Sequence, residues 1–299
     1  MAPFSTFGDC AQFLRPLRAK MEMTMEEDSF EDDIVFCPTC RLILYPTDDS
    51  NKFFLLSCRA CNHEVRLDYE FTWEKHKVNK KSILPPVRKQ NAGTCCPNAV
   101  LTSLDARLNF NRALMNKGPA EMLSLDHLLE QYSEEEERKT GLKYDGSKGY
   151  KLRETAHIIR KKGVLHEHDY ASKNRQGKSW CRARHYPQKN ASFTEICNKI
   201  LKGNVLFTSI PVTEQWSMLK AGDMYMANRD LVITEYYDNK PEESWHAIVL
   251  VGFGQEGGVE YFRFQNSYGT RFCENGIGIV RAREICHIER FEPYYVNDN

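Results

Sequence analysis

The chain lacks both a net charge and a long apolar stretch. Its 41 Lys and Arg residues balance 41 Asp and Glu residues over 299 positions. A neutral chain has no general electrostatic tendency to bind nucleic acid or an anionic membrane surface. No apolar run in the sequence approaches the roughly 18 residues that a membrane-spanning helix needs. The sequence therefore predicts neither a membrane partner nor direct nucleic-acid binding.

The N-terminus also lacks the pattern of a secretory signal. Its first 20 residues contain no continuous apolar core and no small-residue cleavage site. Disulfide frameworks persist mainly in oxidising compartments. We therefore expect an intracellular protein, in the nucleus or cytoplasm, whose cysteines are metal ligands, nucleophiles or buried thiols.

Composition is otherwise ordinary for a globular protein, with 41% apolar and 27% charged residues and no internal repeat. The length has room for one large domain and one small one. Residues 1–33 carry an acidic cluster and little apolar periodicity. We expect this segment to be a disordered acidic tail.

Cysteine is present in unusual number, eleven in all. Four of them form two C-x2-C pairs separated by 17 residues: Cys37, Cys40, Cys58 and Cys61. This spacing is typical of a tetrahedral zinc site, to which each pair supplies two thiolates. The apolar runs at 41–45 and 53–57 predict two strands. A hairpin this small depends on metal binding to fold, so we predict one structural Zn²⁺ in a zinc ribbon at 34–68.

This ribbon resembles the N-terminal zinc ribbon of subunit 9 of eukaryotic RNA polymerase II. The sequence has no second set of paired C-x2-C motifs. The resemblance therefore implies docking to RNA polymerase II or another protein, and not the whole role of that subunit. Beyond the cysteines, the residues that carry the resemblance are Phe36, Leu44, Tyr45, Pro46, Leu55, Leu56 and Arg59.

A second feature is the stretch VRKQNAGTCCPNAVLTSL at residues 87–104, in which a polar turn and two adjacent cysteines precede an apolar helical pattern. A cysteine at a helix N-terminus lies at the positive end of the helix dipole, which lowers its thiol pKa. Nucleophilic catalysis by such a thiol needs a nearby histidine, an oxygen that orients the histidine, and N–H donors for an oxyanion. Cys95 and Cys96 are both candidates.

Three segments in this order resemble the papain family of cysteine peptidases, over about residues 71–295. VRKQ followed by Cys96 resembles the family's oxyanion glutamine six residues before its nucleophile. WHAIVLVGFG resembles its histidine strand, and FQNSYGTRFCENGIG its asparagine segment. The spacing favours Cys96 over its rival Cys95. The resemblance thus implies four site residues: Gln90, Cys96, His246 and Asn266.

The resemblance also implies an α+β fold for residues 69–299, with a helical left lobe and a β-rich right lobe. The pattern of residues favours the same division. Helices are expected after Cys96, from Ser124 as N-cap, and over 152–162, with a charged loop at 133–148. Strands are expected at 204–210, 247–252, 261–265 and 277–281.

The implied activity is hydrolysis of a peptide or protein substrate by a Cys-His-Asn thiolate mechanism. Two residues depart from the family pattern: Pro97 replaces a tryptophan, and Trp245 stands where Asn or Asp is usual. These departures keep two alternatives open. One is a catalytically weak papain-fold interaction protein, and the other is a transcription-associated zinc-ribbon protein like subunit 9.

Overall fold

The computed structural model describes residues 45–46, 55–57, 60–62, 64–66, 68–91, 93–144, 146, 148–172, 178–237 and 240–297. The predicted tail at 1–33 lies outside these ranges. So do three of the predicted zinc ligands: Cys37, Cys40 and Cys58.

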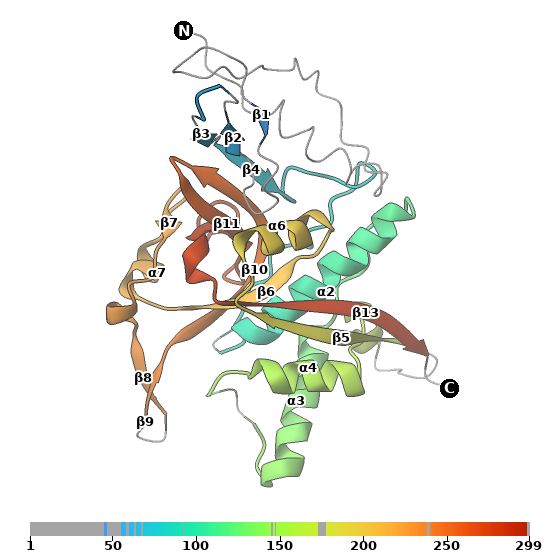
Figure 1. The fold of residues 1–299 in the computed structure, drawn as a ribbon. Helices are drawn as coiled ribbons and strands as arrows, with labels where there is room; N and C mark the ends of the chain where they lie inside the picture. The colour runs from blue at the N-terminus through green and yellow to red at the C-terminus, as the bar shows by residue number, and fades with distance from the viewer. Residues whose placement is uncertain are drawn as a thin grey trace.

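A small antiparallel sheet of three strands precedes the main body of the protein (Figure 1). Its strands are β1 (Tyr45–Pro46), β2 (Leu55–Ser57) and β3 (Glu64–Arg66). Tyr45 pairs with Ser57, so the described residues include part of the hairpin predicted from the apolar runs. Cys61, the fourth predicted zinc ligand, is exposed in the turn between β2 and β3.

The main sheet has the strand order β5-β13-β6-β10-β11-β12-β7, with β4 also paired to β10. Strand β10 lies at its centre, and residues 246–255 are all buried. Gly252 is required there because a Cβ would clash with the carbonyl oxygen of Phe71 in the paired strand β4. The strand bounds are β4 Tyr69–Thr72, β5 Ser179–Lys189, β6 Leu206–Pro211, β7 Met224–Tyr225, β10 Trp245–Glu256, β11 Val259–Gln265, β12 Ile277–Arg281 and β13 His287–Asn297.

Helices form the other part of an α+β architecture, as the sequence predicted. Helix α2 packs against β10 and β13, while α3 and α4 lie together beyond its N-terminal half (Figure 1). The strands β8 (Thr234–Tyr237) and β9 (Lys240–Glu243) form a separate hairpin that leads into β10. The helices are α2 Cys95–Leu114, α3 Leu125–Thr140, α4 Leu152–Lys161, α5 Glu167–Ala171, α6 Phe193–Leu201, α7 Glu214–Met218, and the 3₁₀ turns η1 Arg229–Leu231 and η2 Ala282–Glu284.

Helix α3 begins as predicted, because the Ser124 hydroxyl accepts a hydrogen bond from the backbone N–H of His127. The prediction of a loop from residue 133 was wrong, since α3 continues to Thr140. Its charged second half forms ion pairs one turn apart, such as Arg138 with Glu135 at 2.5 Å. Such pairs stabilise an exposed helical face, so the charge run is helix surface and not loop.

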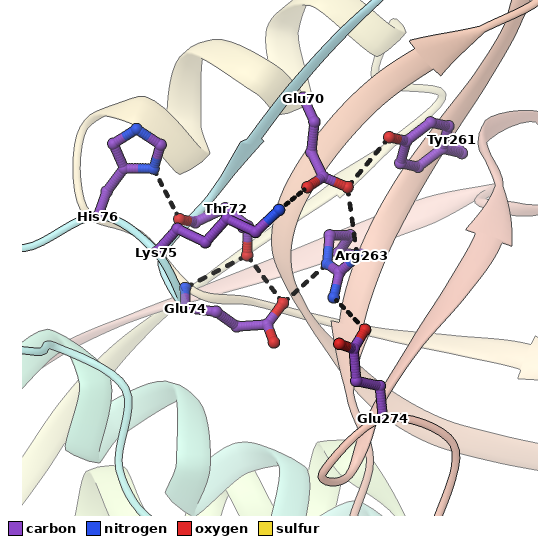
Figure 2. A network of polar contacts seen from close by, with 8 residues as sticks. All are labelled: Glu70, Thr72, Glu74, Lys75, His76, Tyr261, Arg263 and Glu274. Atoms are coloured by element: carbon purple, nitrogen blue, oxygen red, sulfur yellow. Dashed lines mark hydrogen bonds and ion pairs between the residues drawn. The ribbon is translucent and has the colours of Figure 1, made fainter. Parts of the chain in front are cut away.

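Arg263 of β11 anchors the first strand of the large domain (Figure 2). Its side chain is 9% exposed and reaches Glu74 at 2.7 Å, Glu70 at 3.2 Å and Glu274 at 3.4 Å. Because β4 and β11 both pair with β10, these contacts join two of the three strands that pair with the central strand. The network therefore fixes β4, through which the chain enters the domain.

None of the helices in the described ranges is both long and apolar enough to cross a membrane.

Candidate active site

The predicted histidine and asparagine meet at the end of the central hairpin. His246 is the second residue of β10, and Asn266 follows β11, which pairs antiparallel with β10. His246 Nε2 lies 2.7 Å from Asn266 Oδ1. The backbone N–H of Ser267 also donates to that Oδ1, which identifies the atom as the acceptor. Nε2 of His246 therefore carries a proton, and Nδ1 is the open nitrogen of the neutral ring.

The His246 imidazole is almost completely buried, with 4% of the residue exposed. Burial lowers its pKa to about 4, although the hydrogen bond to Asn266 opposes this shift. The ring is thus neutral at pH 7. Trp216 of α7 and Tyr268 enclose it, with ring centroids 5.1 and 4.8 Å from that of His246.

Gln90 lies against the same segment. Its backbone N–H donates to the Ser267 carbonyl at 2.6 Å, and the Ser267 hydroxyl donates to Gln90 Oε1 at 2.5 Å. Because the side-chain oxygen is held in this way, the amide nitrogen is the end of Gln90 that remains to donate. Gly269 N–H also donates to the Arg88 carbonyl at 3.0 Å, so the segment before α2 pairs with the segment after Asn266.

A buried ion pair fixes the other side of this segment. Arg88 Nη2 lies 2.6 Å from Asp105 Oδ2 on α2, and both side chains are buried. The same guanidinium donates to the Leu123 carbonyl, and Leu123 N–H donates to Asp105. Arg88 thereby anchors the segment that carries Gln90 to the body of α2.

The two candidate cysteines point in different directions. Cys96 is 6% exposed, and its sulfur lies 4.0 Å from the Thr155 hydroxyl of α4. Cys95 is half-buried, and its sulfur lies beside the backbone N–H of Ala247, the residue after His246. The structure thus places Cys95 beside the histidine strand, whereas Cys96, the cysteine predicted from spacing, lies against α4.

Helix geometry explains why the two cysteines cannot share this place. Successive residues of an α-helix point about 100° apart, as 3.6 residues per turn require. Cys95 is the first residue of α2, and a tight turn from Asn91 to Thr94 sets its direction. The positive φ of Gly93 (75°) belongs to that turn. Spacing from Gln90 alone does not reveal how the turn rotates the helix start.

Burial raises the pKa of both thiols, and most strongly that of Cys96. For Cys95 the backbone N–H groups of Ala247, Cys96 and Cys95 itself oppose this shift. These donors belong to the start of α2 and to β10. Cys95 thus has backbone donors that favour its thiolate form, although burial outweighs them.

A search against family models matches residues 69–296 to the papain family cysteine proteases. The chain belongs to the papain family. Peptidase 1 of Psoroptes ovis is 27% identical over 142 residues, which are 44% of this chain and 42% of that protein. Pro-cathepsin H of Mus musculus is 25% identical over 151 residues, 46% of this chain and 42% of that protein. The chain thus spans less than half the length of these curated relatives.

Solved structures confirm the papain-like α+β fold. A chain from a study of the mite allergens Blo t 1 and Der p 1 superposes with a TM-score of 0.53 at 17% identity, covering 81% of this chain and 76% of that one. Procathepsin L 3 of the Tenebrio molitor larval midgut gives a TM-score of 0.52 at 15% identity, covering 74% of this chain and 69% of that one.

The two departures from the papain-family pattern leave the site geometry intact. Pro97 is the third residue of α2, a position whose backbone N–H would have no partner within the helix. The missing N–H of proline therefore costs no helical hydrogen bond. Trp245 is 40% exposed, and the Arg229 guanidinium lies 5.6 Å from its ring centroid. The tryptophan side chain therefore faces outward while His246 faces inward, as alternation along a strand requires.

Sequence reasoning missed Trp216, which packs on His246 and lies 3.4 Å from the Tyr268 hydroxyl. It stands in a helix of five residues, too short for a periodic signal. Among the described residues, no three His, Cys, Asp or Glu side chains are grouped so that they could hold a metal ion.

Proposed function

We propose that this papain-family chain is a cysteine peptidase that hydrolyses peptide bonds in peptide or protein substrates, with Cys95 as its nucleophile. The observation that carries the proposal is the buried His246–Asn266 hydrogen bond beside Cys95. That bond orients the imidazole and places its proton on Nε2, so Nδ1 is the nitrogen that can take a proton.

The reaction begins from a neutral pair, because burial disfavours both the thiolate and the imidazolium. The Cys95 thiol gives its proton to His246 Nδ1 as the sulfur attacks the substrate carbonyl carbon. The carbonyl electron pair moves to oxygen, and the Gln90 amide and the Cys95 backbone N–H stabilise the resulting oxyanion. This is the role that the sequence assigned to Gln90 beside Cys96.

Collapse of the tetrahedral intermediate breaks the C–N bond, and His246 gives its proton to the leaving amine. A thioester with Cys95 remains. Water, deprotonated by His246, attacks this thioester and releases the acid, while the thiol recovers its proton. Asn266 keeps the imidazole in one orientation throughout.

A papain-type epoxide inhibitor distinguishes the two cysteines. We expect it to alkylate the wild-type protein at Cys95, identified by mass spectrometry of the labelled peptide. Cys95→Ala should abolish labelling, because Cys96 is buried against Thr155. Cys96→Ala should keep it.

The pair of variants is a matched control, since each removes one sulfur atom from the same helical turn. Labelling of Cys96 in the wild type would return the nucleophile to the position predicted from spacing. No labelling of either thiol under reducing conditions would favour the alternative, a catalytically weak interaction protein.

We further propose that residues 34–68 form a zinc ribbon that docks on RNA polymerase II or another protein. The β1–β2 hairpin supports this, because Tyr45 pairs with Ser57, and Ser57 directly precedes Cys58 in the sequence. Four cysteine thiolates suit structural zinc. Such thiolates persist in a reducing compartment, so the proposal includes an intracellular location.

Metal analysis tests the ribbon separately from the peptidase site. We expect about one zinc ion per chain, the number that one tetrahedral four-thiolate site binds. Cys37→Ser or Cys58→Ser should lose the metal, whereas Cys95→Ser should retain it. Zinc-free wild-type protein, purified without chelators, would contradict the ribbon. A pull-down of polymerase with and without residues 34–68 then tests docking.

A further inference from the structure

The Tyr268 hydroxyl occupies the open nitrogen of His246. Its oxygen lies 3.4 Å from His246 Nδ1, and the Trp216 indole nitrogen lies 3.4 Å from the same oxygen. Tyr268 is two residues after Asn266, so one segment contacts both nitrogens of the imidazole. This arrangement is separate from the Asn266 contact, which involves the other ring nitrogen.

The direction of each hydrogen bond follows from the atoms available. An indole N–H can only donate, so Trp216 donates to the phenol oxygen. Nε2 of His246 is the protonated nitrogen because its partner is the Asn266 carbonyl oxygen. In the neutral ring Nδ1 can only accept, so the Tyr268 hydroxyl donates to it. The hydrogen bonds therefore all run in one direction. Trp216 donates to Tyr268, Tyr268 to His246, and His246 to Asn266.

The same Nδ1 lone pair must receive the Cys95 proton in the proposed reaction. The Cys95 sulfur lies close enough to Tyr268 for its charge to act on the phenol. One lone pair cannot accept both protons. We propose that the Tyr268 hydroxyl is a latch on the catalytic base, which must turn away from Nδ1 before Cys95 can transfer its proton. This inference rests on the proposed peptidase function.

The latch can open without any covalent change in Tyr268. Burial raises the pKa of its phenol, so the hydroxyl stays protonated near neutral pH. The residue is 40% exposed, and the O–H bond can rotate towards water. Once Nδ1 has taken the thiol proton, its N–H pairs with the Cys95 thiolate and the nitrogen no longer accepts from the phenol. Tyr268 is thus a positioning residue whose hydrogen bond stabilises the neutral imidazole and not the imidazolium.

Tyr268→Phe tests the latch because it keeps the ring that covers His246 and removes the hydroxyl. The lost hydrogen bond stabilised the neutral imidazole, so its removal favours the thiolate–imidazolium pair. We expect the rate of Cys95 alkylation by iodoacetamide at pH 7 to rise about fivefold, the equivalent of one neutral hydrogen bond of about 1 kcal/mol. Because the lost bond favoured the neutral ring, the pKa of His246 should rise and the acid limb of the rate–pH profile should move to higher pH.

Tyr294→Phe is the matched control, because Tyr294 has a similar exposure (39%) and lies on β13, outside the site. It should leave the profile unchanged. Tyr268→Ala should instead lower peptidase activity, since it exposes the His246–Asn266 pair to water. If the wild-type protein is alkylated but Tyr268→Phe reacts at the same rate or more slowly, the latch is overturned. The peptidase proposal then stays in place.

A spectroscopic readout is independent of catalysis. In ¹⁵N NMR of the Cys95→Ser protein, the His246 ring should be the neutral Nε2–H form at pH 7. Adding Tyr268→Phe should move the Nδ1 resonance towards that of a free lone pair. An unmoved resonance overturns the latch even if neither thiol reacts with the epoxide and the peptidase proposal fails.

Discussion

Replacing His246 with alanine is expected to lower kcat/KM for peptide hydrolysis by about 10³–10⁴-fold, the upper range for a positioned general acid and base. The imidazole takes the thiol proton, protonates the leaving amine and activates water. Removal of its ring leaves Cys95 half-buried, with a pKa raised by burial and no base beside it. The measurement is steady-state hydrolysis of a fluorogenic peptide library at pH 7.

His168→Ala is the control for this substitution. His168 is exposed on α5, and its recorded hydrogen bond to the Glu121 side chain uses the backbone N–H. Activity should stay at the wild-type level in this variant. A His246→Ala protein that folds and retains more than about a tenth of wild-type activity would contradict the general-base role, given the size of that effect in enzymes.

Asn266→Ala should produce an intermediate loss. The Asn266 carbonyl holds Nε2 at 2.7 Å, and the flanking rings of Trp216 and Tyr268 still confine the imidazole without it. The base is then present but less well oriented. A loss as large as that of His246→Ala would show that the aromatic rings alone do not hold the ring in place.

The pairing of His246 with Asn266 was implied by the resemblance to the papain family, and the local pattern agrees with it. Both residues flank long apolar runs that become β10 and β11, and a hairpin brings the ends of such strands together. Gln90 was predicted from the resemblance of VRKQ and the following cysteine to the papain-family segment. The sequence pattern alone does not show in which direction a side chain points. The directions in which Cys95 and Cys96 point depend on how α2 begins, and a turn of four residues sets that start.

Two half-buried strands were the other source of error in the fold. Strands β5 and β13 pair over eleven positions, yet neither was predicted. Each contains a proline, Pro187 or Pro293, which is unusual inside a strand. Buried residues of β5, such as Cys181 and Ala183, occur only on one face near its start. With one face solvated, the apolar signal of these strands falls below that of β10, which is buried on both faces.

Gln90→Ala is expected to lower kcat/KM by about 10²–10³-fold, the usual effect of removing one oxyanion donor. The Ser267 hydroxyl holds the Gln90 oxygen, so the amide nitrogen is aimed and cannot exchange places with it. An aimed donor contributes most when charge develops in the transition state. The loss should therefore appear mainly in kcat.

Ser267→Ala should lower activity less than Gln90→Ala does. It keeps the donor and removes the bond that orients it, so a loss of about fivefold is expected for one neutral hydrogen bond. Gln90→Glu nearly preserves the shape but replaces the N–H donor with a carboxylate oxygen. Its activity should fall at least as far as that of Gln90→Ala, because the carboxylate repels the oxyanion.

Alkylation separates oxyanion stabilisation from any effect on the nucleophile. Iodoacetamide reacts with the Cys95 thiolate by displacement at carbon, and no oxyanion forms. Gln90→Ala should therefore react with iodoacetamide within about twofold of the wild-type rate, since the group lost acts only on charge developing at oxygen. If hydrolysis and alkylation fell together, Gln90 would instead be acting on Cys95, through the turn at Asn91–Thr94 that sets the direction of its thiol.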